Sequence, residues 1–317
     1  VDDPAMGAAA ADVQCETCHQ DRRGCVGHRG TIVLNSPVTL PLFRLQSQRW
    51  LRVQCHWCGA ILVPPEERPR FRGETPTLRR LTLINDATKE RNRAHCWACG
   101  NENPWLIKSA ETDNVTTVRQ HTHTKAEWAM PAAKVQQILA SLSDEDAAMM
   151  GVAADTHPAR MCLNELPIMP APMRPQMSKD GGRTSHDDLT TMAQIVLRYN
   201  AAIDPAQALD PSPEQAELQL YLATAIHDMT RDDGSDKRQS RMSRPGERAK
   251  LKVAGQTRGS APVPLGNRLA GKPALIRLSI LGRRTWFQAR GVIANDPSLQ
   301  LDQIKIPLVM ATTLQAE

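Results

Sequence analysis

The sequence predicts an α+β protein with more than one domain, held together near its N-terminus by two metal sites. Three observations predict this fold class: paired cysteine motifs in the first hundred residues, apolar residues at helical spacing beside short β-branched segments, and long loops rich in proline or in basic residues. The chain has 317 residues, which is enough for two or three domains. Because aromatic residues make up only 3% of the chain, its core must consist of Leu, Ile, Val, Ala and Met.

The first metal motif lies in the run CETCHQDRRGCVGHRG, where the candidate ligands are spaced C-x2-C-x6-C-x2-H. These candidates are Cys15, Cys18, Cys25 and His28. Two thiolates separated by two residues can bind one tetrahedral ion from a tight turn, and the Cys–His pair completes a set of four ligands. Four protein ligands predict a closed structural zinc site. Disulfides or unrelated cysteines are the alternative interpretation.

A second metal site is predicted from two further C-x2-C motifs, CHWC and CWAC, which are separated by a long loop. Its candidate ligands are Cys55, Cys58, Cys96 and Cys99. Gly59 and Gly100 follow the two motifs, at positions where a turn favours a residue that tolerates positive φ. The remaining cysteine, Cys162, lies in an apolar run and is predicted to be a buried core thiol. Two structural Zn²⁺ ions bound by thiolates imply a reducing environment, and we therefore expect an intracellular protein.

The segments around these motifs are expected to be short strands and loops. Residues 31–34 are β-branched and apolar and predict a strand, whereas residues 64–80 are rich in Pro and Arg and predict an irregular loop. Residues 112–124 are polar and β-branched and predict a hairpin or a linker. His121 and His123 lie there, and they either bind a metal or are solvated.

Two helices are predicted in the middle of the chain. The first begins at Pro131, in the first-turn position where its missing N–H costs nothing, and has one apolar face. That face contains Val135, Ile138, Leu139 and Leu142. The second helix is capped by Ser143 and ends at Gly151. Its acidic residues 144–146 could be mistaken for a metal cluster, but the preference of a helix N-terminus for carboxylates explains them better.

The later elements follow from proline positions and caps. Residues 161–175 predict an apolar strand that runs into a stiff Pro-rich segment. Asp187 or Asp188 caps the next helix, and Ser212 opens another. Residues 292–309 predict short strands interrupted by prolines.

Basic residues dominate the C-terminal part of the chain. The formal net charge of the whole chain is +5. Between residues 237 and 258, Glu247 is the only acidic residue among many Lys and Arg residues. A further series of basic residues, from Arg268 to Arg290, is interleaved with apolar residues. A solvated charged face is the alternative interpretation, but unbalanced positive charge favours contact with phosphates. The candidate nucleic-acid-binding residues are Lys250, Lys252, Arg268, Lys272, Arg277, Arg283, Arg284 and Arg290.

Several of these segments, in this order, resemble the N-terminal part of the largest subunit of multisubunit DNA-directed RNA polymerases, in its archaeal and eukaryotic form. The resemblance covers nearly the whole chain and is weakest in residues 64–90 and 232–261. The similar segments are DDPAMG, CETCHQDRRGCVGHRGTIVLNSPV, LSDEDAAMMGV, ELPIMPAPMRPQ, HDDLTTMAQIVLRYN and GNRLAGKPALIRLSILGRRTWFQARGVIANDPSLQLDQIKIP.

The resemblance implies a clamp module that is part of a larger assembly. Its implied domains are a zinc-binding clamp head in residues 1–125, a helical clamp core in residues 126–232, and a rudder-like basic loop with a template-binding switch segment in residues 233–317. The core includes a lid-like loop at residues 167–187, which in the family helps to part RNA from template DNA. Leu275 stands where the family usually has a basic residue, so one phosphate contact is expected to be missing.

The implied function is that of a noncatalytic clamp portion of RNA polymerase, a nucleotidyltransferase, which holds the template DNA and the RNA–DNA hybrid. The family's three catalytic aspartates occur in an NADFDGD-like run, and this sequence has no such run. Either the subunit is split between genes, as in some viruses and phages, or the sequence is a fragment of a longer subunit. The expected partners are the chain that carries those aspartates and their Mg²⁺, together with the second-largest subunit. No membrane partner is expected. The alternative function is a stand-alone zinc-containing nucleic-acid-binding regulator derived from a polymerase subunit.

Overall fold

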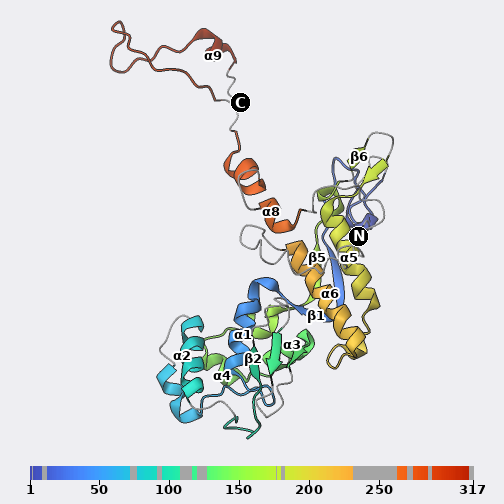
Figure 1. Ribbon diagram of the computed structural model, residues 1–317. Coiled ribbons are helices and arrows are strands. Elements are labelled where there is room, and N and C mark those ends of the chain that lie inside the picture. The colour runs from blue at the N-terminus through green and yellow to red at the C-terminus, as the bar shows by residue number, and fades with distance from the viewer. Residues whose placement is uncertain are drawn as a thin grey trace. The chain divides into compact units, whose positions relative to one another are not determined.

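The computed structural model confirms the α+β fold class and divides into two units, Val1–Asn267 and Arg268–Glu317 (Figure 1). The domain boundaries expected after residues 125 and 232 both fall inside the first unit and stay predictions. The structure describes residues 1, 3–8, 13–71, 77–90, 95–107, 116–119, 127–175, 177–179, 183–230, 263–269, 274–284 and 288–313.

Two long strands form the centre of the first unit. Strand β1 (Gly30–Thr39) pairs antiparallel with β5 (Cys162–Ile168), so that Gly30 lies opposite Ile168 and Thr39 opposite Cys162. The side chains of β1 alternate between buried and less buried positions, as a half-buried strand requires. The predicted strand at residues 31–34 is therefore confirmed as the start of a longer one.

The register of the two strands shifts between Val33 and Val38, and helix α5 (Asp188–Ala202) supplies the hydrogen bonds that the ladder loses there. The backbone N–H of Asn35 donates to Oδ1 of Asn200 at 2.7 Å, and Nδ2 of Asn200 donates to the Val33 carbonyl at 2.8 Å. A buried backbone group without a partner costs free energy, so these bonds stabilise the irregular stretch.

The first hydrophobic core lies among four helices and the second metal motif. Its fully buried side chains include Leu51, Ile61, Ile84, Leu139 and Met150. The helices are α1 (Arg44–Val53), α2 (Thr77–Glu90), α3 (Ala132–Ala140) and α4 (Asp144–Met149). All four residues of the apolar face predicted on α3 are buried.

The expectation of an irregular loop through residues 64–80 is wrong at its C-terminal end. A short 3₁₀ helix, η3 (Pro65–Phe71), is followed by α2, which begins at Thr77. The reason is that Leu81 and Ile84 repeat at helical spacing and are buried in the core, which outweighs the Pro and Arg content of the preceding residues.

The predicted helix caps are confirmed in atomic detail. The Ser143 hydroxyl accepts a hydrogen bond from the Asp146 N–H at 3.2 Å, and the Asp187 carboxylate accepts one from the Leu189 N–H at 2.8 Å. Asp187 is thus the cap of α5. Pro131 lies one residue earlier than expected, at the N-cap of α3.

A second core fills the space between the long strands and a helix pair. Helix α6 (Pro213–Thr230) packs against α5, and the Tyr199 and Tyr221 rings of the two helices lie 5.5 Å apart, centre to centre (Figure 1). Val196 of α5 and Leu222 of α6 are fully buried in this core. Among the described residues, no helix is both long and apolar enough to span a membrane.

Two small sheets complete the first unit. The first joins β2 (Trp105–Ile107), β3 (Thr116–Arg119) and β4 (Glu127–Met130) in sequence order, and all pairs are antiparallel. The second is a hairpin of β6 (Met177–Lys179) and β7 (Arg183–Ser185). Strand β3 lies within the predicted hairpin-or-linker segment, whereas His121 and His123 lie outside the described residues.

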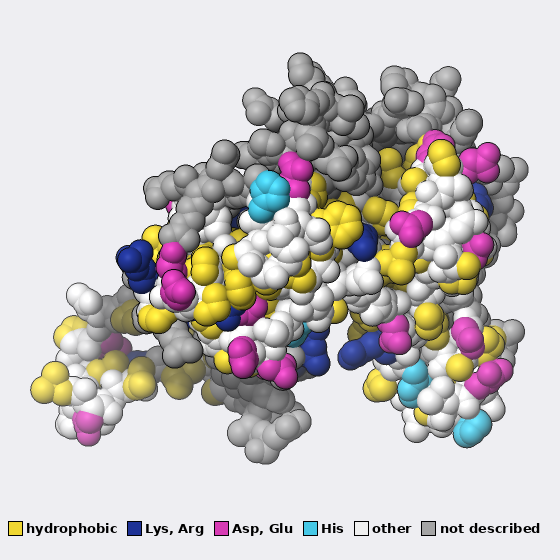
Figure 2. All heavy atoms as spheres, turned by 90° about the horizontal axis from the view of Figure 1, so that it is seen from below, with side chains coloured by type: hydrophobic (Ala, Val, Ile, Leu, Met, Phe, Trp, Pro, Cys, Tyr) yellow, Lys and Arg dark blue, Asp and Glu magenta, His cyan; other side chains and the backbone are white. Residues whose placement is uncertain are grey.

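The second unit contains little regular structure. Its elements are the end of α8 (Leu265–Leu269), a π-helical segment η9 (Ile276–Leu281) and α9 (Leu308–Thr313). The strands expected in residues 292–309 are wrong, because a strand needs a partner's N–H and C=O groups and the described part of this unit supplies none. Val292 and Ile293 are 97% and 98% exposed. Figure 2 shows apolar side chains lying between charged ones over one face of the molecule.

Candidate metal centres and nucleic-acid interface

Three short turns, each opening with a candidate ligand cysteine, share one backbone geometry. In each turn the N–H of the residue after the second cysteine donates to the carbonyl of the first cysteine, at 2.8 to 3.1 Å. The three donor and acceptor pairs are His19 with Cys15, Gly59 with Cys55, and Gly100 with Cys96. The N–H of the first cysteine in turn donates to the carbonyls of Gln20, Ala60 and Asn101, respectively. These bonds close each turn so that its two thiols reach the same point.

The residue after the second cysteine has left-handed backbone geometry in all three turns. Gly59 has φ 77° and Gly100 has φ 71°, which confirms the role predicted for both glycines. The first turn places His19 there, with φ 56°. A histidine at this φ is strained relative to glycine. Its position directly after C-x2-C is the signal in the sequence from which this strain could have been predicted.

The four candidate ligands of the first motif meet at one point. The ligand atoms of Cys15, Cys18, Cys25 and His28 all lie within 4.8 Å of one another, and all three cysteines are free thiols. Among the described residues, the buried Nε2 of His28 has no hydrogen-bond partner, as a nitrogen reserved for a metal ion would lack one. The Gly27 N–H donates to Cys25 Sγ at 3.4 Å. Thiol and imidazole donors in a set of four fit a structural zinc ion.

The second set, Cys55, Cys58, Cys96 and Cys99, also gathers its sulfur atoms within 4.8 Å. The Sγ atoms of Cys55 and Cys99 are 3.7 Å apart, as are those of Cys58 and Cys96. A tetrahedral ion with metal–sulfur bonds of about 2.3 Å separates its sulfurs by about 3.8 Å. The observed spacing therefore matches four thiolates around one zinc ion.

Each half of the second site is tied to the other by a tryptophan. The indole N–H of Trp57 donates to the Glu102 carbonyl at 2.9 Å, and that of Trp97 donates to the Ile61 carbonyl at 2.7 Å. Glu102 and Ile61 belong to the β-bridges that close the opposite turns. Neither tryptophan was predicted to be a site residue, although one lies inside each C-x2-C motif of the second site.

A buried ion pair connects the second site to α4. Nη1 of Arg68 lies 2.8 Å from Oδ1 of Asp146, whose other oxygen accepts the Ile61 N–H at 3.2 Å. The Arg68 guanidinium also lies 5.5 Å from the centre of the Trp97 ring. Among the described residues, only the two cysteine-rich groups gather into candidate metal sites, so the acidic cluster at residues 144–146 is explained by capping and by this ion pair.

Two titratable groups in this region do not belong to either ligand set. Burial lowers the pKa of His56, and the nearby Lys134 charge lowers it too, against the opposing hydrogen bond that His56 Nε2 makes to the Leu51 carbonyl at 2.9 Å. Burial raises the pKa of Cys162, which is 5% exposed and confirms the predicted core thiol. Both groups are therefore uncharged at neutral pH.

Four of the five described arginines of the second unit are exposed to solvent. Arg277, Arg283, Arg284 and Arg290 are exposed, and none of them forms an ion pair with a carboxylate among the residues that the structure describes. Arg268 is half-buried and has a polar contact. Lys250, Lys252 and Lys272 lie outside the described residues.

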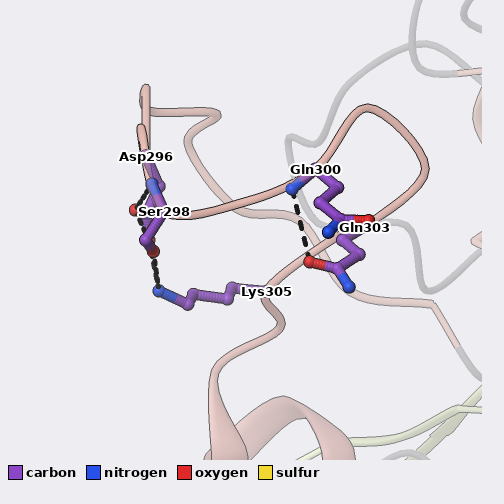
Figure 3. Close-up of polar contacts among 5 residues, drawn as sticks. All are labelled: Asp296, Ser298, Gln300, Gln303 and Lys305. Atoms are coloured by element: carbon purple, nitrogen blue, oxygen red, sulfur yellow. Dashed lines mark hydrogen bonds and ion pairs between the residues drawn. The ribbon is translucent and has the colours of Figure 1, made fainter.

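A local network occupies one of the few acids of this unit. Nζ of Lys305 lies 2.5 Å from Oδ2 of Asp296, and the Ser298 hydroxyl donates to Oδ1 of Asp296 at 2.6 Å (Figure 3). The Lys305 ammonium and Ser298 together lower the pKa of Asp296. Lys305 is thus neutralised locally, whereas the four exposed arginines keep their charge available for another molecule.

The chain matches two models of known protein families. A family model described as RNA polymerase Rpb1, domain 1, matches residues 1–239, and one described as RNA polymerase Rpb1, domain 2, matches residues 282–317. The first match covers more than half of the chain. The chain therefore belongs to the family of the largest subunit of RNA polymerase, as its motifs predicted.

Relatives come from a virus, an archaeon and a eukaryote. The DNA-directed RNA polymerase RPB1 homolog of African swine fever virus (isolate Tick/South Africa/Pretoriuskop Pr4/1996) is 26% identical, over 99% of this chain and 21% of the viral protein. Subunit Rpo1N of Methanothermobacter thermautotrophicus is 28% identical, over 98% of this chain and 34% of the archaeal protein. The RNA polymerase II subunit RPB1-A of Trypanosoma brucei brucei is 27% identical, over 95% of this chain and 18% of that protein. The chain thus spans about a fifth of the length of the viral relatives that it matches.

Proposed function

We propose that this chain is the noncatalytic clamp portion of the largest subunit of a DNA-directed RNA polymerase and holds template DNA and the RNA–DNA hybrid during transcription. The observation that carries the proposal is the match to both Rpb1 domains in chain order. The relatives described above, all DNA-directed RNA polymerase subunits, support the same assignment.

We propose that the second unit binds the phosphate backbone of the nucleic acid. A guanidinium group offers a planar fork of donors that fits two phosphate oxygens and reads no base, as a processive enzyme requires. The four exposed arginines Arg277, Arg283, Arg284 and Arg290 support this role, and we propose that Arg268, Lys250, Lys252 and Lys272 contribute further phosphate contacts.

The proposed work of the two cysteine sites is structural. Each would hold one Zn²⁺ with four protein ligands, which leaves no open coordination position for a substrate. When bound, zinc supplies cross-links between segments distant in the sequence, as between residues 55–58 and residues 96–99. The Mg²⁺ ions of nucleotidyl transfer would be held elsewhere in the assembled enzyme, by the family's catalytic aspartates.

Exposed apolar residues support an assembled subunit rather than the alternative, a stand-alone regulator. Leu278, Ile280, Leu281, Val292 and Ile293 of the second unit are all exposed. A protein that functions alone rarely exposes so many large apolar side chains in one segment, because their burial against a partner is favourable.

The test is mass spectrometry of the native assembly purified through this chain from its own source. We expect stoichiometric recovery of an NADFDGD-like run and of the second-largest polymerase subunit. Recovery of this chain alone, folded and able to bind DNA, would overturn the clamp assignment in favour of the regulator.

A further inference from the structure

The first metal site lies against the start of the Pro-rich segment. His28, the last ligand of the site, lies two residues before Gly30, where β1 begins. Gly30 pairs with Ile168 at the end of β5. The chain leaves β5 at Ile168 and enters Met169 to begin the Pro-rich segment. One end of the antiparallel ladder therefore joins the metal site to that segment.

Two glycines of the metal-site region leave room for two prolines. A Cβ added at Gly27, which has φ +87°, would lie 2.5 Å from Cβ of Pro170. A Cβ added at Gly7, which has φ +127°, would lie 2.8 Å from Cδ of Pro172 and 3.2 Å from Cα of Gly27. The two distances to proline atoms are shorter than real Cβ contacts, so the backbone at Gly7 and Gly27 is packed directly onto the two proline rings.

The opposite side of the same segment is fixed by a buried arginine. Arg174 donates from Nε to the Met169 carbonyl at 2.9 Å, from Nη1 to the Thr190 hydroxyl at 2.7 Å, and from Nη2 to the Val1 carbonyl at 2.9 Å. The base of the Pro-rich segment, residues 169–174, is thus held between the first metal site and helix α5.

The two glycines of the second metal site have other neighbours. A Cβ added at Gly59 would lie 2.3 Å from the Ser141 hydroxyl oxygen, next to helix α3, and one added at Gly100 would meet nothing within 4 Å. Among the described residues, the glycine contacts to the segment 169–174 therefore come from the region of the first metal site and not from the turns of the second.

We propose that the first metal site positions the base of the Pro-rich segment, with Gly7 and Gly27 as its positioning residues, whereas the second site has no part in this. The ion holds the turn of Cys25 and His28 closed, and that turn supports Pro170 and Pro172. The consequence for transcription rests on the proposed function, in which this segment is the lid that parts RNA from template DNA.

The two sites can be separated with a matched pair of variants, Cys18→Ser and Cys58→Ser, each of which removes one accessible ligand thiol. Both are expected to lower the zinc content of the full chain from two ions to one. Hydrogen exchange at the Met173 and Arg174 amides, which bond to the Pro170 and Ala171 carbonyls, reports on the base of the segment. We expect about tenfold faster exchange in Cys18→Ser and no change in Cys58→Ser. Equal exchange in the two variants would overturn the proposal.

A second pair keeps all ligands in place. Gly27→Ala and Gly100→Ala impose left-handed strain at similar φ values, +87° and +71°, but only the first clashes with Pro170. We expect Gly27→Ala to retain two zinc ions and to speed exchange at Met173 and Arg174 about tenfold, and Gly100→Ala to leave that exchange unchanged. Partial rescue by the double variant Gly27→Ala/Pro170→Gly is expected because the clashing Cβ is removed. A Gly27→Ala chain with wild-type exchange at these amides refutes the positioning role.

A third measurement separates this inference from the proposed function. In the assembled polymerase, Gly27→Ala should lengthen the RNA–DNA hybrid upstream, as mapped by nuclease protection, if the segment is the lid. Altered exchange with an unchanged hybrid leaves the positioning by the metal site established and overturns the lid assignment. Unaltered exchange overturns the positioning itself, whatever the hybrid length.

Discussion

Asp146 shows how one side chain can serve two structures at once. Its backbone N–H is bound by the Ser143 cap, while its carboxylate is buried, accepts the Ile61 N–H and pairs with Arg68. Arg68 in turn lies over Trp97 of the second metal site. The first turn of α4 is thereby connected to both halves of that site, since Ile61 belongs to one half and Trp97 to the other.

We expect Asp146→Asn to destabilise the chain by about 3 kcal/mol, because it leaves the Arg68 charge largely buried without its partner. Urea unfolding of the zinc-loaded chain measures the effect. Asp144→Asn is the matched control, since it changes an exposed acid in the same helical turn and should cost less than about 1 kcal/mol. Equal losses in the two variants would show that the ion pair contributes nothing beyond the helix dipole.

At the scale of elements, metal-closed turns take the place of a large core near the N-terminus. The hydrophobic cluster around the first site consists of Ala8, Cys15 and Cys25 with Cys18 beside it, which is too small to order these residues by burial alone. Binding of a metal ion to a site that exists only in the folded chain contributes directly to folding.

Chelation of zinc should therefore expose thiols in a defined pattern. With zinc bound we expect all eight cysteines to resist a thiol reagent at pH 7.5, because seven are ligands and Cys162 is buried with a raised pKa. After chelation seven should react quickly and Cys162 slowly, its rate rising as the pH approaches its raised pKa. Counting modified thiols by mass spectrometry checks this. Fast reaction of ligand cysteines before chelation would contradict zinc ligation.

Loss of zinc from the full chain should also lower its thermal midpoint and melt the turns first. Circular dichroism and hydrogen exchange would distinguish this local loss from global unfolding. Helices α5 and α6 contain their own core and are expected to remain protected longest. An unchanged thermal midpoint after complete removal of zinc would show that the sites contribute no folding energy.

At the scale of the whole molecule, the two units differ in the charged and apolar residues that they expose. The first unit contains both hydrophobic cores and both metal sites, whereas the second exposes arginines and large apolar side chains together. The exposed apolar residues of the second unit find no core within its described part, and we expect other polymerase chains to bury them. We expect the exposed arginines, which form no ion pair among the described residues, to contact phosphates.

The salt dependence of DNA retention measures the second of these contacts. Each phosphate contact contributes about 0.9 to the slope of log affinity against log salt, so Arg283→Gln with Arg284→Gln should reduce the slope by about 1.8 in the assembled polymerase. Base preference should not change. Lys305→Gln is the control, because Asp296 already neutralises that ammonium group. A slope that is unaltered in the arginine variant would show that these arginines contact no phosphate.

The sequence by itself determined the local features of this protein. The ligand spacing, the glycines after Cys58 and Cys99, and the caps at Ser143 and Asp187 depend on residues within one turn of the backbone, so their patterns are visible in the chain. The order of the motifs also identified the family, because family segments keep their order even where single residues differ.

Only the tertiary structure decided which elements meet. No local pattern reveals that Pro170 packs on Gly27, that Arg68 joins Asp146 to Trp97, or that Leu81 and Ile84 are buried in the first hydrophobic core. The same holds for residues 292–309, where β-branched composition does not produce strands because no partner strand is present among the described residues of that unit. Contacts between distant residues depend on how whole elements pack, and that information is spread over the chain rather than carried by any one segment.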